Sequence, residues 1–219
     1  TDDEFSRPRK VAEFARELLR LKSRIYITFG EPLDPFGNRV DFQGRSLDGR
    51  GRPVDIKGYV CRDGNHVVDP QRDREYTSEL ARAIVRSFEV DNRLQSTHIV
   101  AFTLFHMMQA AHPTYDLYRL LRDAAAITSF SAHEVVEVLA RVLERVRGLA
   151  ENTKIRLDPR LDGRDAQAVL DHGLRYFGSY HHQPAVARDG NRIVIRDAEL
   201  TYYYRNRADG YNIESVVGA

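Results

Sequence analysis

Histidines, arginines and one cysteine are the residues of this sequence that could do chemistry. His181 and His182 are adjacent but lack a third ligand at the spacing that a metal site needs. His112 and Asp116 lie on either side of an expected helix–helix turn, and Cys61 has no base beside it. There is also no glycine-rich phosphate loop, dinucleotide fingerprint or G-x-S-x-G elbow. The sequence therefore predicts no catalytic residue, no metal site and no cofactor.

Three arginines are the candidates for binding an anion. Arg72 and Arg74 occur in "QRDREYT", and Arg205 follows a run of tyrosines in "LTYYYRNR". The guanidinium group forms a planar fork that suits phosphate and carboxylate. Asp73 and Glu75 compete with such an anion, because each can pair with a neighbouring arginine.

Composition limits the functions that these side chains can serve. The chain has 219 residues, enough for one large domain or two small ones, and its net charge is +1. That balance gives no electrostatic case for nucleic acid. A single cysteine excludes an internal disulfide framework and a cysteine zinc site. No apolar run reaches the roughly 20 residues that span a bilayer, and the absence of an initiator Met before Thr1 suggests a piece of a longer protein.

The first third of the chain predicts little regular structure. A capped amphipathic helix is expected from Ser6, with Val11, Phe14 and Leu18 on its apolar face. A strand over 24–29 ends at Gly30-Glu31-Pro32, and nothing nearby looks able to pair with it. Residues 36–75 form an irregular excursion rich in glycine and proline, with a possible hairpin between 54–61 and 66–68.

Residues 76–219 are expected to form a helical domain. Thr77 caps a helix that ends near Asp91, and the segment 98–111 is apolar nearly all round, which predicts a buried central helix. His106 is then a core histidine whose hydrogen bonds are satisfied. Four side chains of this helix are expected at the centre of the bundle: Ile99, Phe102, Phe105 and Met108.

Shorter elements follow the central helix. The pattern predicts helices over 115–126, from 132 onward and over 165–177, the second with a Ser131–Glu134 capping box and the third ending at Gly178. Asp189-Gly190 predicts a hairpin near 185–195, and a last helix ends near Gly210. That order is typical of a winged-helix module, but the candidate recognition helix is not basic, so packing is favoured over DNA binding.

The last helix carries three successive tyrosines. Tyr203 or Tyr204 is expected to be largely buried, and Arg205 and Arg207 to reach outward or toward a core formed by another part of the protein. Its amphipathic character also suits the surface of a membrane.

Two of these stretches resemble a known family. "RIYITFGEPLDPFGN" resembles the strand and loop that end the acyltransferase core of glycerophospholipid acyltransferases, and "LTYYYRNR" resembles the tyrosine-rich helix near the C-terminus of bacterial glycerol-3-phosphate 1-O-acyltransferases. "QRDREYTSELARAIV" and "STHIVAFTLFHMM" are similar to the helical region between them. The resemblance implies that strand 24–29 is the last strand of a sheet formed by residues upstream.

The resemblance also implies a function and a setting. In that family a histidine in an H-x4-D motif takes a proton from the hydroxyl of glycerol 3-phosphate, which attacks an acyl thioester on acyl carrier protein or coenzyme A. None of the eight histidines here has an Asp five positions on, so no catalytic residue can be assigned. The implied setting is the cytoplasmic face of a bacterial inner membrane, with the protein bound peripherally and no nucleic acid as partner.

The sequence therefore predicts an α+β, mostly helical chain. The end of an α/β acyltransferase core, 1–35, precedes the irregular excursion, 36–75, and a helical, winged-helix-like C-terminal bundle, 76–219. Its expected function is the structural or regulatory C-terminal part of a glycerol-3-phosphate acyltransferase. The alternatives are a stand-alone helical interaction module, which docks acyl carrier protein or a membrane, and a winged-helix DNA binder.

Overall fold

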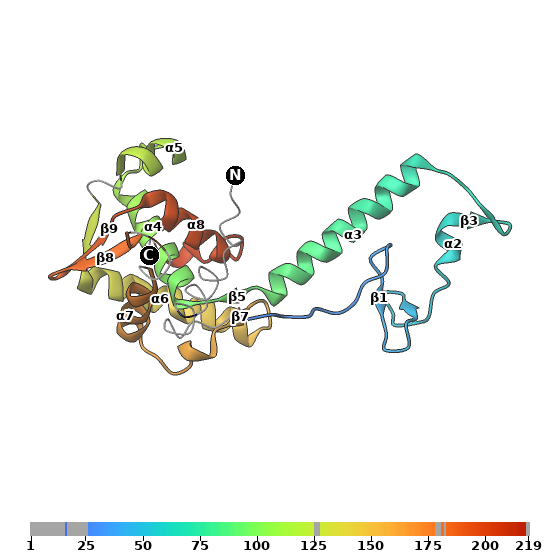
Figure 1. Cartoon of the computed structure of the whole chain (residues 1–219), viewed down its shortest axis with the longest axis horizontal. Coiled ribbons are helices and arrows are strands. Elements are labelled where there is room, and N and C mark those ends of the chain that lie inside the picture. Colours follow the sequence, from blue (N-terminus) through green and yellow to red (C-terminus); the bar gives the residue numbers. More distant parts are fainter. Residues whose placement is uncertain (1–15, 17–25, 125–127, 178–180, 182, 218–219) are drawn as a thin grey trace.

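The apolar segment of the sequence forms the central helix of the fold. The computed structural model describes residues 16, 26–124, 128–177, 181 and 183–217. Helix α4 (Ser96–Ala111) packs against α6 (Ala132–Glu151), α7 (Ala166–Phe177) and α8 (Ala198–Arg205), as Figure 1 shows. The expectation of a buried centre is confirmed, because four of its side chains are fully buried: Ile99, Phe102, Phe105 and Met108. We call residues 92–217 the body.

A small antiparallel sheet covers one side of the body. Strands β8 (Val186–Asp189) and β9 (Arg192–Ile195) form the expected hairpin, and β6 (Ser129–Ser131) adds to β9, so that the order is β6-β9-β8. The expected capping box at Ser131 is wrong. Ser131 pairs with Arg192 in the ladder and its side chain makes no capping bond to α6.

Short elements connect the helices of the body. A turn of α-helix, α5 (Leu117–Arg119), continues into the π-helical η2 (Leu120–Ala124), where one longer helix was expected. Asp165 accepts a hydrogen bond from the amide of Ala168 and so caps α7. Three short helical turns complete this part: η3 (Pro159–Leu161), η4 (Asn206–Ala208) and η5 (Glu214–Val216).

A short parallel pairing joins the start of α4 to the end of α6. β5 (Arg93–Leu94) lies beside β7 (Arg156–Leu157). The pairing places Asp158, which follows β7, next to the first turn of α4. The chain is therefore α+β, with helices as the larger part.

A long helix projects from the body (Figure 1). Helix α3 (Pro70–Asp91) begins eight residues before the expected start, because Asp69 accepts from the amides of Gln71 and Arg72 and Pro70 occupies the first helical position. The expected cap at Thr77 is wrong, since its hydroxyl bonds to the Asp73 carbonyl inside the helix. We call residues 26–91 the arm.

The excursion that the arm carries is a repeat of one turn. An Asp-x-x-Gly unit recurs every seven residues, and in each copy the Gly amide donates to the Asp carbonyl while the Asp side chain accepts from following amides. The copies begin at Asp34, Asp41, Asp48 and Asp55. Two-residue strands β1 (Arg39–Val40) and β2 (Ser46–Leu47) pair between copies, followed by α2 (Lys57–Val60) and the hairpin β3 (Cys61–Arg62) and β4 (Asn65–His66). The expected hairpin is thus present but is two residues long on each side.

Close contacts hold the first part of the arm along α3. A Cβ on Gly30 would lie 2.9 Å from Ser87 Oγ, and one on Gly37, where φ is +82°, would lie 3.3 Å from the Leu80 Cα. Glycine suits both the close approach and the positive φ. The rings of Phe36, Tyr59 and Tyr76 form a cluster with centroids 4.7–5.3 Å apart, which fixes the repeat to the start of α3.

The strand expected over 24–29 finds no pairing partner within the described residues. Residues 26–29 belong to no strand, since no other described segment pairs with them. The expected helix through Val11 and Leu18 lies outside the described residues apart from Arg16, which is helical, and so does Gly178.

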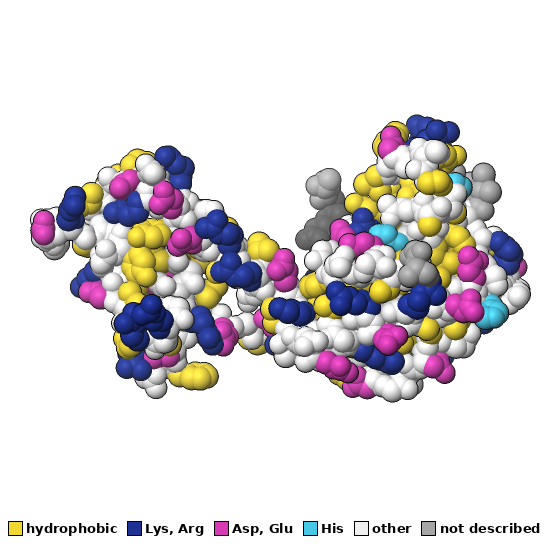
Figure 2. Space-filling model, turned by 180° about the vertical axis from the view of Figure 1, so that it is seen from behind, with side chains coloured by type: hydrophobic (Ala, Val, Ile, Leu, Met, Phe, Trp, Pro, Cys, Tyr) yellow, Lys and Arg dark blue, Asp and Glu magenta, His cyan; other side chains and the backbone are white. Residues whose placement is uncertain are grey.

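Figure 2 shows hydrophobic side chains on the surface of the arm between many basic ones. No helix in the described part is long and apolar enough to cross a membrane.

Candidate functional site

A pocket of about 1000 Å³ lies where the arm meets the body. Its walls come from the extended segment of the arm, the end of α3, the first turn of α4 and the end of α8. Its lining is mostly polar and aromatic: Tyr26, Thr28, Phe88, Asp91, Asn92, Arg93, Gln95, His98, His181, Tyr203, Tyr204, Asn206 and Arg207.

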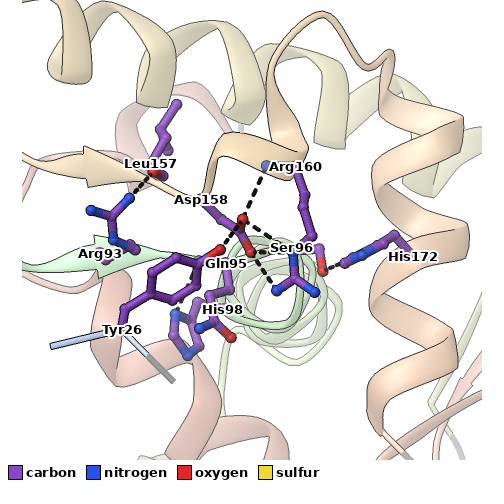
Figure 3. A network of polar contacts seen from close by, with 9 residues as sticks. All are labelled: Tyr26, Arg93, Gln95, Ser96, His98, Leu157, Asp158, Arg160 and His172. Atoms are coloured by element: carbon purple, nitrogen blue, oxygen red, sulfur yellow. Dashed lines mark hydrogen bonds and ion pairs between the residues drawn. The ribbon is translucent and has the colours of Figure 1, made fainter. Parts of the chain in front are cut away.

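A buried carboxylate anchors one wall of this pocket. Asp158 is fully buried and accepts hydrogen bonds from the Tyr26 hydroxyl at 2.7 Å and from the Arg160 guanidinium at 2.6–3.1 Å, as Figure 3 shows. Burial alone would raise the pKa of Asp158, but the hydrogen bonds from Arg160 and Tyr26 outweigh it and hold that pKa below its usual value. The ionised Asp158 therefore fixes Tyr26, and with it the arm, against the body.

Next to this anchor, a serine and a histidine form a buried pair. Ser96 Oγ lies 2.7 Å from His172 Nδ1, and both residues are almost fully buried (Figure 3). Burial, and then the charges of Arg160 and Arg164, lower the pKa of His172. A nucleophilic serine has to reach its substrate, and neither Ser96 nor His172 lines the pocket. The pair joins α4 to α7 away from this pocket.

His98 is the histidine that faces the pocket from α4. Its Nδ1 accepts a hydrogen bond from the Gln95 amide at 3.2 Å, which leaves the proton of the neutral ring on Nε2. Burial, with a smaller effect of the Arg207 charge, lowers the pKa of His98 to about 4. At neutral pH the ring is therefore an uncharged donor.

Positive charge is in excess at the pocket. Arg93 donates to the Leu157 carbonyl at 2.6 Å and lies 4.6 Å from the centre of the Tyr26 ring. Neither Arg93 nor Arg207 forms an ion pair with a described carboxylate. The carboxylate in the lining, Asp91, is already held by Arg156 at 2.7 Å.

The arginines that the sequence singled out do not line the pocket. Arg72 bonds to the Val67 carbonyl and to Asp73, and Arg74 is exposed on α3. The expectation that Arg205 reaches outward is wrong, because the residue is only 9% exposed. It pairs with Asp209 at 2.8 Å and lies over the rings of Phe105 and Tyr202. Its neighbour Arg207 is the arginine that reaches the pocket.

Of the tyrosines and histidines that the sequence singled out, some line the pocket and others do not. Tyr203 is 69% exposed and Tyr204 half-buried, with Tyr204 Oη 3.0 Å from His181 Nε2. His106 lies in the core with Nε2 buried and without a hydrogen-bond partner in the described chain, so the expectation of a satisfied histidine is wrong. His182 lies outside the described residues, and no described group of His, Cys, Asp and Glu could hold a metal ion.

Sequence reasoning missed Arg93, His98 and Arg207 as a group. The available signal was the polar stretch "DNRLQSTH" immediately before an apolar helix, because polar residues at the entrance of a buried helix need solvent, a cavity or a hydrogen-bond partner. Their convergence with Arg207 depends on the fold. Comparisons with protein-family models, curated proteins and solved structures gave no match to this chain.

Proposed function

We propose that this chain is the non-catalytic C-terminal part of a bacterial glycerol-3-phosphate acyltransferase, and that its arm packs against the catalytic core of that enzyme. The core would carry the histidine that deprotonates glycerol 3-phosphate and would bind acyl carrier protein or coenzyme A. The body would be a structural or regulatory unit on the cytoplasmic face of the inner membrane.

The observation that carries this proposal is the exposure of the segment 26–29. Ile27 is 75% exposed and Phe29 92% exposed, and alternate residues of an extended chain point to the same side. Two large apolar side chains on one side of an unpaired extended segment are expected of a strand whose sheet lies elsewhere. Burying both would contribute about 3–6 kcal/mol, at about 1.5–3 kcal/mol for each.

Helix α3 also exposes large apolar side chains. Ile84 and Val85 are 38% and 53% exposed, although both are large and apolar. A helix with an unpartnered apolar face is typical of a docking surface. The docking of the arm on an α/β core would cover this face and supply the strand that segment 26–29 lacks.

The order of elements in the body supports a winged-helix-like bundle that serves for packing and not for DNA binding. Helix α5, strand β6, helices α6 and α7 and the β8–β9 hairpin follow in this order, with the short β7 and η3 between α6 and α7, and β6 lies beside β9. DNA binding is not favoured, because Asp171 on α7 pairs with Arg188 of the hairpin at 2.7 Å and so neutralises the basic residue that a wing would offer to phosphate.

The test uses the complete gene product. It should contain, upstream of Thr1, a domain with the H-x4-D motif, and should transfer labelled acyl groups to glycerol 3-phosphate, whereas the 219-residue chain alone should transfer none. Replacing Ile27 and Phe29 by serine should weaken the docking of the arm and reduce that activity.

The matched control is Phe42→Ser. Phe42 is fully exposed on the repeat, away from segment 26–29, and its replacement should leave activity unchanged. Acyl transfer by the 219-residue chain alone, or a complete gene without an acyltransferase domain, would overturn the proposal. In the second case a stand-alone interaction module becomes the better interpretation.

A further inference from the structure

We propose that the pocket between arm and body binds a small organic phosphate, with the phosphate at Arg207, Arg93 and His98 and the organic part against Phe88 and Tyr203. The proposal does not depend on acyl transfer, and none of the residues it uses belongs to the expected catalytic machinery.

The charges of the lining select an anion. Arg93 and Arg207 have no described carboxylate partner, and the acidic side chain of the lining, Asp91, is held by Arg156 through two hydrogen bonds of 2.7 and 3.0 Å. Hydrogen bonds from a guanidinium to phosphate are charge-assisted and are among the strong ones in proteins. A neutral or cationic ligand would leave this excess of positive charge uncompensated.

The hydrogen-bonding groups favour phosphate over a simple halide ion. His98 presents Nε2–H as a donor, because its Nδ1 is occupied by the Gln95 amide. The amide side chain of Asn206 lies in the same lining as Arg207. Several donors from different directions match a group with three terminal oxygens.

The aromatic side chains of the pocket favour a ligand that carries an organic group as well as the phosphate. Phe88 at the end of α3 is 72% exposed, and Tyr203 on α8 is 69% exposed, yet both line the pocket. Exposed aromatic surface is unfavourable in water, and an apolar or planar group on the ligand would cover it. At about 1000 Å³ the pocket is at the upper end of the range for small-molecule sites, and therefore holds more than a phosphate ion.

The site is also built to keep its shape. Tyr26 is fixed by the buried Asp158, and His98 by its bond to the start of α4. The backbone carbonyl of Arg207 accepts from Asn92 Nδ2 at 2.6 Å, which ties the end of α8 to the end of α3. Both walls are therefore in place before a ligand arrives, which lowers the cost of binding.

Calorimetric titration of the 219-residue chain tests this directly. The probes are phenyl phosphate, inorganic phosphate, phenol and a short-chain phosphatidic acid below its micelle concentration. We expect phenyl phosphate to bind more tightly than inorganic phosphate, and phenol, which lacks the charge, not to bind. Tighter binding of the phosphatidic acid would identify a lipid headgroup as the source of the phosphate, and weaker binding a soluble metabolite.

Two variants separate the charge from the aromatic wall. Arg207→Gln should weaken binding of both phosphates roughly tenfold or more, and the exposed α3 variant Arg74→Gln, the matched control, should leave it unchanged. Tyr203→Ser should remove most of the preference for phenyl phosphate over inorganic phosphate. Arg207 is exposed, so its variant is expected to fold, which circular dichroism checks.

Three results would overturn the proposal. They are the absence of binding of either phosphate at millimolar concentration, an equal loss in Arg74→Gln and Arg207→Gln, and phenol binding as well as phenyl phosphate. Each can occur whether or not the complete protein transfers acyl groups, so failure here is distinguishable from failure of the proposed function.

Discussion

Replacing His98 by glutamine should remove much of the acid sensitivity of this chain. The ring is largely removed from solvent at the start of α4, and this desolvation lowers its pKa from 6.5 to about 4. Glutamine at this position can still accept the amide bond from Gln95, as it does in a capping box, but it cannot take up a proton. The substitution therefore keeps the local hydrogen bond and removes the titration.

The magnitude follows from the difference between the two pKa values of His98. Below pH 6.5 the unfolded chain takes up a proton that the folded chain refuses until about pH 4, so the free energy of unfolding falls as the pH falls through this window. The loss is about 1.4 kcal/mol for each pH unit. It amounts to about 2 kcal/mol between pH 7 and pH 5 and to about 3 kcal/mol by pH 4. Stability is fully present above pH 6.5.

Urea unfolding at a series of pH values measures this effect. The half-buried His106 and the buried His172 also have lowered pKa values and titrate in the same direction, so only the difference between wild type and variant isolates His98. The matched control is His133→Gln, which replaces a histidine whose side chain is 78% exposed. If His98→Gln keeps the wild-type dependence between pH 7 and pH 5, or loses no more of it than the control does, the buried and neutral state of His98 is wrong.

Two further substitutions test the body and the arm. Phe102→Ala should lower the free energy of unfolding by about 3–5 kcal/mol, because it leaves a cavity at the centre of α4, and chemical denaturation measures it; a loss below about 1 kcal/mol would contradict the central placement. Gly37→Ala should detach the repeat from α3, because φ is +82° and the Leu80 Cα would be 3.3 Å from the new methyl group. Hydrogen exchange would then speed up in residues 34–60 and not in the body, and unchanged exchange would show that the arm tolerates the methyl group.

The helices of the body could be predicted from the sequence because their apolar residues are periodic. Along α6, Val135, Val138, Leu139 and Val142 recur at helical spacing, and all four are buried. The α4 segment is apolar on every side, and the only place for such a helix in water is the centre of a bundle. The hairpin at Gly190 follows from its turn residues. In each case the signal lies within one element.

What the sequence did not predict depends on contacts between distant segments. Arg205 and Arg207 lie two residues apart on the same polar stretch, but only the first has Asp209 and the Phe105 ring beside it, which makes its burial favourable. Tyr26 meets Asp158 across 132 positions. Strand β6 is only three residues long, and its pairing with β9 cannot be inferred from so short a pattern. The pocket is also formed by contacts between segments far apart in the sequence, and its arginines could therefore not be predicted from the sequence.

The repeat of the arm could have been predicted, and its regularity bears on how the arm works. Each Asp-x-x-Gly unit satisfies its own backbone groups through the Asp carbonyl and carboxylate, so the excursion needs no core to hold its turns. Arg45 and Arg52 pair with the Asp of their own unit, which neutralises charge locally. Phe29 and Val85 take no part in these turns and are 92% and 53% exposed. Their apolar character is what the proposed docking of the arm on a catalytic core predicts.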